Sequence, residues 1–179
     1  MDIDELMVHR AIAAKPELIE AKLGIKLDRT SLIHHYPLSS KGEHIDFVFN
    51  DVSGVTYLAE VKVRVSPIRV IPQLYDHEYK KFVEMNPEVD KNKIIPVIVT
   101  DEGSVTDQDR DILSRMSIRL CAYSLSEIEE ILKEQVDVEP AITIEFPEID
   151  GIEDFVKKTK ILHENLCPIN SHAELLSFS

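Results

Sequence analysis

Two segments in the first half of the chain alternate between apolar and polar residues, and they constrain the fold more than any other feature. In HIDFVFN (44–50), Ile45, Phe47 and Phe49 share one face, and in TYLAEVKVRV (56–65) most odd-numbered residues are apolar. Alternation of this kind is typical of β-strands with one face in a core. The two segments are close enough in sequence to form a hairpin.

The apolar faces restrict how these two strands pair. Both strands must direct their odd-numbered residues into one core, so the numbers of directly paired residues must sum to an even value. A three-residue loop, 52–54, meets this condition and ends in glycine, where a left-handed conformation is required. Asp46 then lies opposite Glu60, and His44 opposite Lys62. A four-residue loop would misalign these pairs.

The charged face of the hairpin has two interpretations. Asp46 and Glu60 would repel each other across the strand pair, unless a divalent cation lies between them. Carboxylate oxygens and water are the ligands that Mg²⁺ takes, and Lys62, one step along, could orient water or stabilise charge on a phosphate. The face then predicts a metal-dependent phosphoryl-transfer site. The alternative is a solvated sheet face, since Glu60, Lys62 and Arg64 stand at alternate positions.

The remaining segments predict an α/β domain over residues 1–139. Helices are expected at 2–14, 15–24, 66–86, 106–116 and 125–135, and strands at 31–38, 43–50, 55–65, 93–100 and 117–124. Antiparallel strands come first and crossover connections later. After Pro140 an acidic C-terminal extension (140–179) is expected, with a strand near 141–146 and a helix near 152–166.

Composition excludes several classes of protein. No apolar run approaches the roughly 20 residues of a membrane helix, and the five glycines form no phosphate-binding loop. Cys121 and Cys167 lie far apart with no pairing pattern, which favours a reducing, cytoplasmic setting. Cys121 stands in an apolar strand and is expected to be a core residue. The net charge of −13 opposes nucleic-acid binding, but residues 127–179 hold 13 acids and four lysines, whereas 60–82 hold five bases and three acids.

One set of spacings resembles a known signature. Glu60 follows Asp46 by fourteen positions and is followed by Val61 and Lys62, which resembles the PD-(D/E)XK nuclease motif. Gln73, eleven positions after Lys62, looks like the glutamine of RecB-like members. Together with KPELIEAKLGIKL and the run from His44 to His77, roughly residues 5–100 resemble the nuclease domain of the NucS (EndoMS) endonucleases.

The resemblance implies a restriction-endonuclease-like core, in which helices flank a mixed central sheet. It implies a DNA endonuclease that uses Mg²⁺ or Mn²⁺, with Asp46, Glu60 and the Val61 carbonyl as metal ligands. The metal would polarise the phosphate and lower the pKa of the attacking water. Lys62 would position or deprotonate that water or stabilise developing charge, and Gln73 would support the site.

Further residues are candidates for supporting roles. The resemblance makes Glu20 a possible additional metal ligand from an early helix, with Glu17 as a competitor. At the position of a family tyrosine the chain has His77, either a substitute or a helix-surface residue. His34 and His35 have no ligand partner nearby in sequence and are expected to be partly exposed histidines. Residues that could contact DNA phosphates are Arg64, Arg69, Lys80 and Lys81.

Two functions from different classes remain open at this point. The first is the DNA endonuclease, with DNA as its partner. The second is a catalytically inactive module that keeps the nuclease fold to bind protein or nucleic acid, which the overall acidity favours. NucS-like enzymes have a further N-terminal domain that this chain does not match, so mismatch recognition is not expected to carry over. The extension 140–179 could mediate a homodimer or bind a protein partner.

Overall fold

We describe residues 2–136 of the protein in a computed structural model. The expected acidic extension, with its strand and helix, lies outside the described residues. Among those that are described, no helix is long and apolar enough to cross a membrane.

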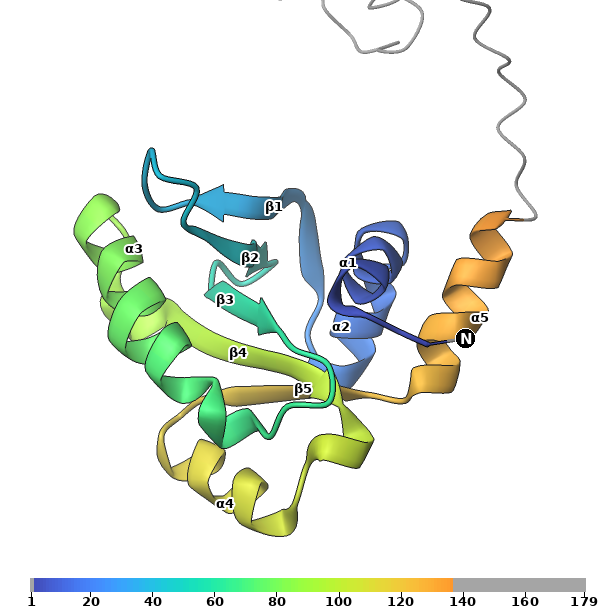
Figure 1. The fold of residues 1–179 in the computed structure, drawn as a ribbon. Coiled ribbons are helices and arrows are strands. Elements are labelled where there is room, and N and C mark those ends of the chain that lie inside the picture. The colour runs from blue at the N-terminus through green and yellow to red at the C-terminus, as the bar shows by residue number, and fades with distance from the viewer. Residues whose placement is uncertain (1, 137–179) are drawn as a thin grey trace, which may run out of the picture. The chain divides into compact units, whose positions relative to one another are not determined.

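A five-stranded mixed sheet forms the centre of residues 2–136 (Figure 1). Its strands lie in chain order: β1 (Leu27–Pro37), β2 (His44–Asp51), β3 (Thr56–Val61), β4 (Ile94–Asp101) and β5 (Arg119–Tyr123). β1, β2 and β3 pair antiparallel, whereas β3, β4 and β5 pair parallel. The predicted α/β class and mixed sheet are confirmed.

Helices cover both faces of the sheet (Figure 1). One face carries α1 (Glu5–Ala14), α2 (Glu17–Leu23) and α5 (Leu125–Val136). The other carries the π-helix η2 (Pro72–Tyr79), α3 (Lys80–Met85) and α4 (Asp107–Arg115), with short 3₁₀ turns η1 (Pro67–Arg69), η3 (Lys91–Lys93) and η4 (Glu102–Ser104) nearby in sequence. The predicted order of helices and strands therefore holds.

Local sequence signals explain where these helices begin and end. The Asp4 carboxylate accepts a hydrogen bond from the Met7 N–H and caps α1. Gly24, with φ of 62°, ends α2 in the left-handed conformation that glycine adopts readily. Thr106 and Asp109 form a reciprocal capping box at the start of α4.

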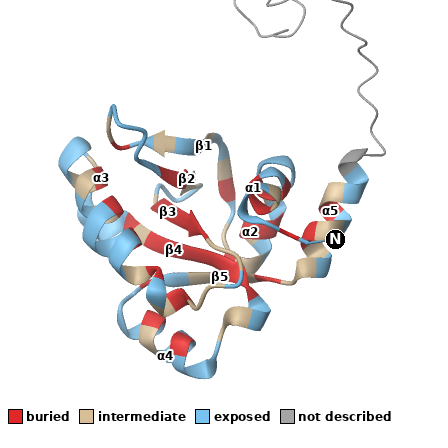
Figure 2. Cartoon of the chain, in the orientation of Figure 1, coloured by how far each residue is buried: buried red, intermediate tan, exposed pale blue. Residues whose placement is uncertain are grey.

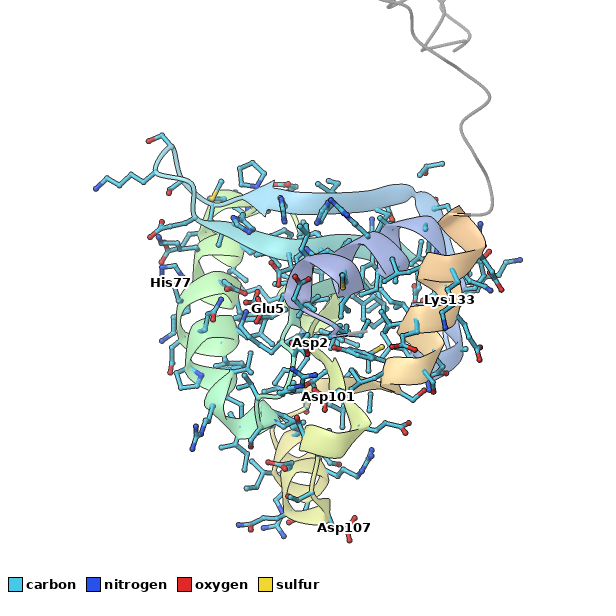
Figure 3. The ribbon with its side chains drawn as sticks, turned by 45° about the vertical axis from the view of Figure 1, so that its right-hand side comes forward. Asp2, Glu5, His77, Asp101, Asp107 and Lys133 are labelled. Carbon is cyan, nitrogen blue, oxygen red and sulfur yellow. The ribbon has the colours of Figure 1, made fainter. Side chains whose placement is uncertain are left out.

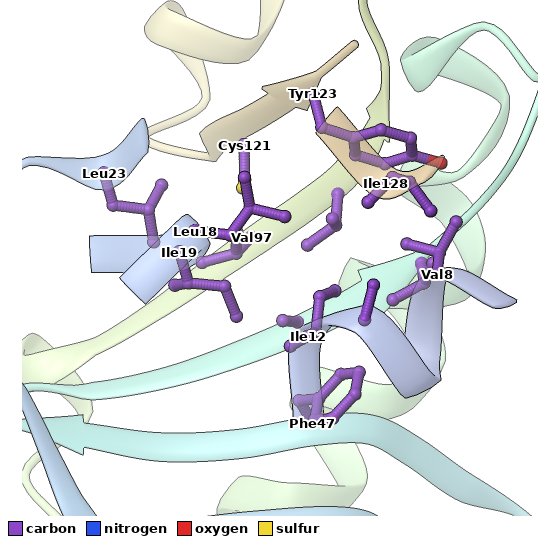
Figure 4. Packing of buried hydrophobic residues seen from close by; sticks show 14 of the residues in the cluster. Val8, Ile12, Leu18, Ile19, Leu23, Phe47, Val97, Cys121, Tyr123 and Ile128 are labelled. Carbon is purple, nitrogen blue, oxygen red and sulfur yellow. The ribbon is translucent and has the colours of Figure 1, made fainter. Parts of the chain in front are cut away.

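Two apolar clusters, one on each face of the sheet, make up the core. The first joins strand residues such as Phe47, Val97 and Tyr123 to α1, α2 and α5, as Figure 4 shows. The second joins Leu58 and Ile98 to η2, α3 and α4. Burial on both sides of a sheet is typical of strands with parallel neighbours.

The two faces of β3 are therefore both covered. All six of its residues are buried (Figure 2), and Glu60 is only 2% exposed. The interpretation of the charged face as a solvated sheet face is wrong. Ile45 also differs from expectation, because it packs in the second cluster and not with Phe47 and Phe49.

The hairpin register agrees with the prediction. Phe47 pairs with Ala59 and Asn50 with Thr56, which is the predicted register, but the β2–β3 pairing ends at Phe47 and does not extend to the predicted pairs of Asp46 with Glu60 and His44 with Lys62. Gly54 has φ of 81°, as a three-residue loop with a terminal glycine requires.

β3 is shorter than the predicted strand 55–65. It ends at Val61, after which the Lys62 N–H still donates to the Val99 carbonyl. Arg64 then takes a left-handed φ of 58°, and its N–H donates to the Asp101 carboxylate at 2.5 Å. This turn carries the chain off the sheet.

The helix expected over 66–86 is divided into three pieces. Pro67 begins η1 and Pro72 begins η2, and each proline lacks the N–H that a continuous helix would use. From Pro72 to Tyr79 the chain is a π-helix, with hydrogen bonds from residue i to residue i+5, and it continues into α3.

Candidate active site

A cleft of about 400 Å³ lies where β2 begins and β3 ends, beside α1 and η2. Glu5 on α1 and His77 on η2 are labelled in Figure 3 and belong to different walls of it. The cleft is lined by Glu5, Gly42, Glu43, His44, Asp46, Glu60, Lys62, Gln73, His77 and Glu78. The structure thus brings together the predicted residues Asp46, Glu60, Lys62 and Gln73.

Asp46 is buried, and its carboxylate contacts β3 and α1. Its Oδ2 accepts the Val61 N–H at 2.8 Å and lies 3.5 Å from His9 Nε2, and its Oδ1 lies 3.6 Å from His44 Nε2. Burial opposes ionisation, but the contacts from His9 and the Val61 N–H hold the pKa of Asp46 below its usual value. Asp46 is therefore a carboxylate at neutral pH.

Glu60 has the most perturbed carboxyl group of the cleft. Its Oε1 accepts from Lys62 Nζ at 2.7 Å and from Gln73 Nε2 at 2.6 Å. Burial, with the charges of Asp46 and Glu78, raises the pKa of Glu60 to about 8, and Lys62 opposes this only in part. Without a further positive charge, Glu60 keeps its proton at neutral pH.

Glu78 joins these residues, although it was not selected from the sequence. It is 2% exposed, and its Oε1 accepts from Gln73 Nε2 at 2.8 Å. Burial, and then the charge of Asp46, raise the pKa of Glu78. The amide of Gln73 therefore bridges two buried carboxyl groups, Glu60 and Glu78.

Lys62 supplies the positive charge of the cleft. Its Nζ lies 2.7 Å from Glu60 Oε1, 2.9 Å from the Val61 carbonyl oxygen and 3.6 Å from Glu5 Oε2. Burial disfavours the ammonium, but the hydrogen bond to Glu60 and the charge of Glu5 raise the pKa of Lys62 above its usual value. Lys62 is therefore a protonated donor.

The donor atoms of the cleft fit a hard divalent cation. Five acidic side chains line it against one lysine. The Oε2 atoms of Glu60 and Glu78 are both buried without a hydrogen-bond partner, and an unpaired buried carboxylate oxygen is costly. An oxygen-coordinated cation would satisfy these atoms and offset the repulsion.

The carboxylates do not form a closed cage. Among residues 2–136, the groups of three possible ligand atoms within 4.8 Å of one another all include histidines. An open arrangement suits Mg²⁺ or Mn²⁺ better than Ca²⁺, because Mg²⁺ usually keeps several waters and takes one or two carboxylates.

Glu20 and Glu17 lie away from this cleft. Glu20 Oε1 accepts the Leu27 N–H at 2.9 Å and so fixes the start of β1, and Glu17 pairs with Arg29. The acid that the first helices contribute to the cleft is Glu5, on α1. Its selection from sequence would have required knowing that the start of α1 packs beside the end of β3.

His77 and the basic candidates lie around the cleft or farther out. His77 is exposed on η2, with Nε2 3.6 Å from Glu43 Oε1. Lys81 also contacts Glu43, at 2.5 Å, and Lys80 pairs with Asp76. These side chains are held by acids on the same surface.

Arg64 and Arg69 follow the end of β3. Arg64 Nη2 lies 2.6 Å from Asp2 Oδ1, so this guanidinium is already paired. Arg69 is exposed on η1. Of the four predicted phosphate contacts, Arg64, Lys80 and Lys81 would have to exchange an acidic partner for a phosphate.

Comparisons with known proteins show similarity of structure. No protein-family model and no curated protein sequence matches the chain. A structure of an EndoMS–dsDNA complex is 16% identical, with a TM-score of 0.50, over 69% of this chain and 46% of that chain. A repair endonuclease from Pyrococcus abyssi (16% identity, TM-score 0.49) and EndoMS in its apo form (19%, 0.46) each match over 69% of this chain and 48% of theirs.

This chain spans about half the length of those proteins, so the likeness concerns one part of them. The matching part has the same restriction-endonuclease-like arrangement of a mixed sheet between helices. The resemblance predicted from the spacing of Asp46, Glu60 and Lys62 is confirmed at the level of the fold. The described part of the chain has a NucS-like (EndoMS-like) nuclease fold, shared with the matching part of that protein.

Proposed function

We propose that the protein is a metal-dependent DNA endonuclease that hydrolyses phosphodiester bonds in the cleft between α1 and η2. The observation that carries this proposal is the pair of unsatisfied buried oxygens, one on Glu60 and one on Glu78, beside the ionised Asp46. A fold in which the positions of Glu60 and Glu78 served only for packing would not retain buried carboxyl groups there.

Asp46, Glu60 and Glu78 would hold the cation, with the Val61 carbonyl as a further oxygen ligand at the end of β3. Mg²⁺ and Mn²⁺ suit a set made only of oxygens. A bound cation would supply Lewis acidity toward a phosphate oxygen and would lower the pKa of water. Glu60 must lose its proton to take part, so cation binding is coupled to proton release.

Lys62 and Gln73 have distinct tasks in this proposal. Lys62 Nζ donates to Glu60 and to the Val61 carbonyl, and so lies against two of the proposed ligands. From there the ammonium can orient a water or stabilise negative charge on the phosphate. The Gln73 amide holds Glu60 and Glu78 in a fixed relation.

DNA is the proposed substrate because the similar fold has been solved with double-stranded DNA. Arg69, exposed after the end of β3, and the ion-paired Arg64, Lys80 and Lys81 are the proposed phosphate contacts. Binding through these few contacts should weaken as the salt concentration rises, with a slope set by the number of phosphate contacts that form.

The test is cleavage of supercoiled, linear and mismatched duplex DNA by the full chain, with Mg²⁺, Mn²⁺ or EDTA. We expect cleavage only with a cation, and no cleavage by Asp46→Asn or Glu60→Gln. Glu17→Gln, an exposed acid on α2 outside the cleft, is the matched control and should cleave normally.

Binding of Mn²⁺ without cleavage of any of these substrates would contradict the enzyme and favour the inactive module. Mn²⁺ binding is measured by calorimetry, so that this outcome is separate from a failure to bind the cation at all. A cleaving activity that survives in Asp46→Asn would show a contaminating nuclease or a different site.

A further inference from the structure

Histidines from α1 and β1 meet beside Asp46. His9 Nδ1 lies 2.8 Å from His34 Nε2, and the rings of His34 and His35 have centroids 3.8 Å apart. One nitrogen from each of these three residues lies within 4.8 Å of the others. We name His9, His34 and His35 the histidine triplet. His34 and His35 are exposed, as predicted, and the packing of α1 gives them a neighbour, His9, that is distant in sequence.

The backbone of β1 is what places two successive histidines together. Neighbouring residues of a strand normally point to opposite faces. His35 instead has φ of 55°, a left-handed conformation that only a few per cent of non-glycine residues adopt. The register of β1 against β2 also shifts between Asp28 and Ile33. This irregular edge strand brings both rings to His9.

The Asp46 carboxylate lies beside His9, the buried member of the histidine triplet. Its Oδ2 faces His9 Nε2 at 3.5 Å, which favours the tautomer with the proton on Nε2 and leaves the Nδ1 lone pair toward His34. A ligating histidine in a metal site almost always donates its second ring N–H to a carboxylate, a backbone carbonyl or water.

We propose that the histidine triplet binds one transition-metal ion of the zinc type, with Asp46 as the outer partner that orients His9. Three imidazoles with an open fourth position are a zinc ligand set, and imidazole also suits Ni²⁺, Co²⁺ and Cu²⁺. Ligand nitrogens of a tetrahedral site lie roughly 3.3 Å apart at the usual Zn–N distance of about 2 Å. The 2.8 Å between His9 and His34 needs a change on the order of half an ångström.

An overlapping group, His35, His44 and Asp46, is the competing position for the ion. Asp46 Oδ2 already faces the Val61 N–H and His9, so this group would take the remaining oxygen, Oδ1, away from the cleft. An ion on the histidine triplet would leave Asp46 Oδ1 available to the cation of the cleft. The triplet and the oxygen site in the cleft then differ in ligand type and do not compete.

The experiment uses the full chain without a histidine tag, freed of metal and then held in excess Mg²⁺. Co²⁺ is titrated while its visible absorption is followed, and Zn²⁺ is measured by calorimetry. We expect one tightly bound ion with the intense visible bands of tetrahedral Co²⁺. His34→Asn and His35→Asn, both exposed in the structure, should each weaken Zn²⁺ binding at least tenfold.

Three variants act as controls in the same titration. His77→Asn changes an exposed histidine on η2 and should leave the Zn²⁺ affinity unchanged. His44→Asn should do the same, and a loss of binding there with retention in His34→Asn would overturn the assignment to the triplet. Glu60→Gln removes a carboxylate of the cleft and should keep Zn²⁺ binding.

Zn²⁺ affinity that is equal in the wild type, His34→Asn and His35→Asn would also overturn the proposal. Melting temperatures in EDTA show whether each variant is folded. Zn²⁺ affinity is measured without nuclease activity. The proposed zinc site can therefore be refuted while the proposed endonuclease activity is confirmed, and the reverse.

Discussion

Replacing Glu60 with glutamine tests the electrostatics of the cleft without any assumption about catalysis. Glu60 is 2% exposed, and burial with the charges of Asp46 and Glu78 raises its pKa from 4.5 to about 8. A carboxyl group with a raised pKa in the folded state contributes stability below its unfolded pKa and loses it as the pH rises through the folded pKa. Glutamine has the shape of the protonated side chain and does not titrate.

The magnitude follows from the two pKa values. Between them the folded protein binds one more proton at Glu60 than the unfolded chain does, so the free energy of unfolding falls by about 1.4 kcal/mol per pH unit. From pH 5.5 to 7.5 the wild type should lose roughly 2 to 3 kcal/mol relative to Glu60→Gln.

The assay is urea unfolding of the metal-free chain in EDTA at several pH values. Glu43→Gln is the control, because the Lys81 ammonium holds the pKa of Glu43 below its usual value and Glu43 stays ionised over this range. Its difference from the wild type should not depend on pH. If the difference between the wild type and Glu60→Gln is equally flat, Glu60 is not protonated in the folded protein and the argument for a cation-dependent cleft is lost.

Four further outcomes are expected. Asp46→Asn should remove both DNA cleavage and the stabilisation of the fold by Mn²⁺, and a melting shift by Mn²⁺ that persists in this variant would contradict the assignment. Lys62→Ala should lower the single-turnover cleavage rate by about 100-fold or more while Mn²⁺ affinity stays within a few fold; an equal loss of both would place Lys62 in cation binding alone. Glu78→Gln should weaken Mn²⁺ binding at pH 8 at least tenfold and should stabilise the metal-free protein, since it removes a buried carboxyl group whose pKa is raised. Truncation after Glu139 removes the acidic extension, which would compete with DNA for the basic residues, so it should tighten DNA binding at low salt, with the difference shrinking as salt rises. No change at any salt would contradict this competition, and loss of solubility would place the extension in the core.

The hairpin shows what the sequence could predict about this site. Alternation of apolar residues and a loop ending in Gly54 were enough to predict the pairing of Phe47 with Ala59, next to which Asp46 and Glu60 line one cleft. The rule works because a one-residue slip would turn Phe47 and Phe49 out of the core. The same alternation did not reveal that the charged face is covered, because strands buried on both sides depend on helices that come later in the chain.

Glu78 shows a limit that lies in helix geometry. Gln73 and Glu78 are five residues apart, and on an α-helix such residues do not share a face. In the π-helix η2 residues five apart are joined by the backbone hydrogen bond, so the Gln73 amide reaches Glu78 at 2.8 Å. The resemblance indicated His77, four residues after Gln73, and this side chain is exposed. Two prolines close together, Pro67 and Pro72, were the available sign that the helix is irregular.

Glu5 and His9 could not be selected because nothing local distinguishes them. Both stand on α1, with Glu5 57 positions before its partner Lys62 and His9 37 positions before its partner Asp46. Their positions follow from how α1 packs on the first apolar cluster, through Val8 and Ile12. One face of that helix fills the core, and its two polar residues then reach Lys62 and Asp46.

The local irregularities of the domain coincide with its polar cluster, and this coincidence is an argument for function. The π-helix carries Gln73 and Glu78, and the left-handed residue His35 brings a ring to the edge of Asp46. Each departure from regular structure costs free energy, and so does a buried carboxyl oxygen without a partner. The two apolar clusters supply the stability that offsets these costs. Selection for stability alone would have removed the irregular backbone and the unpaired carboxyl oxygens. The proposed cation binding would give each of these features a reason to persist.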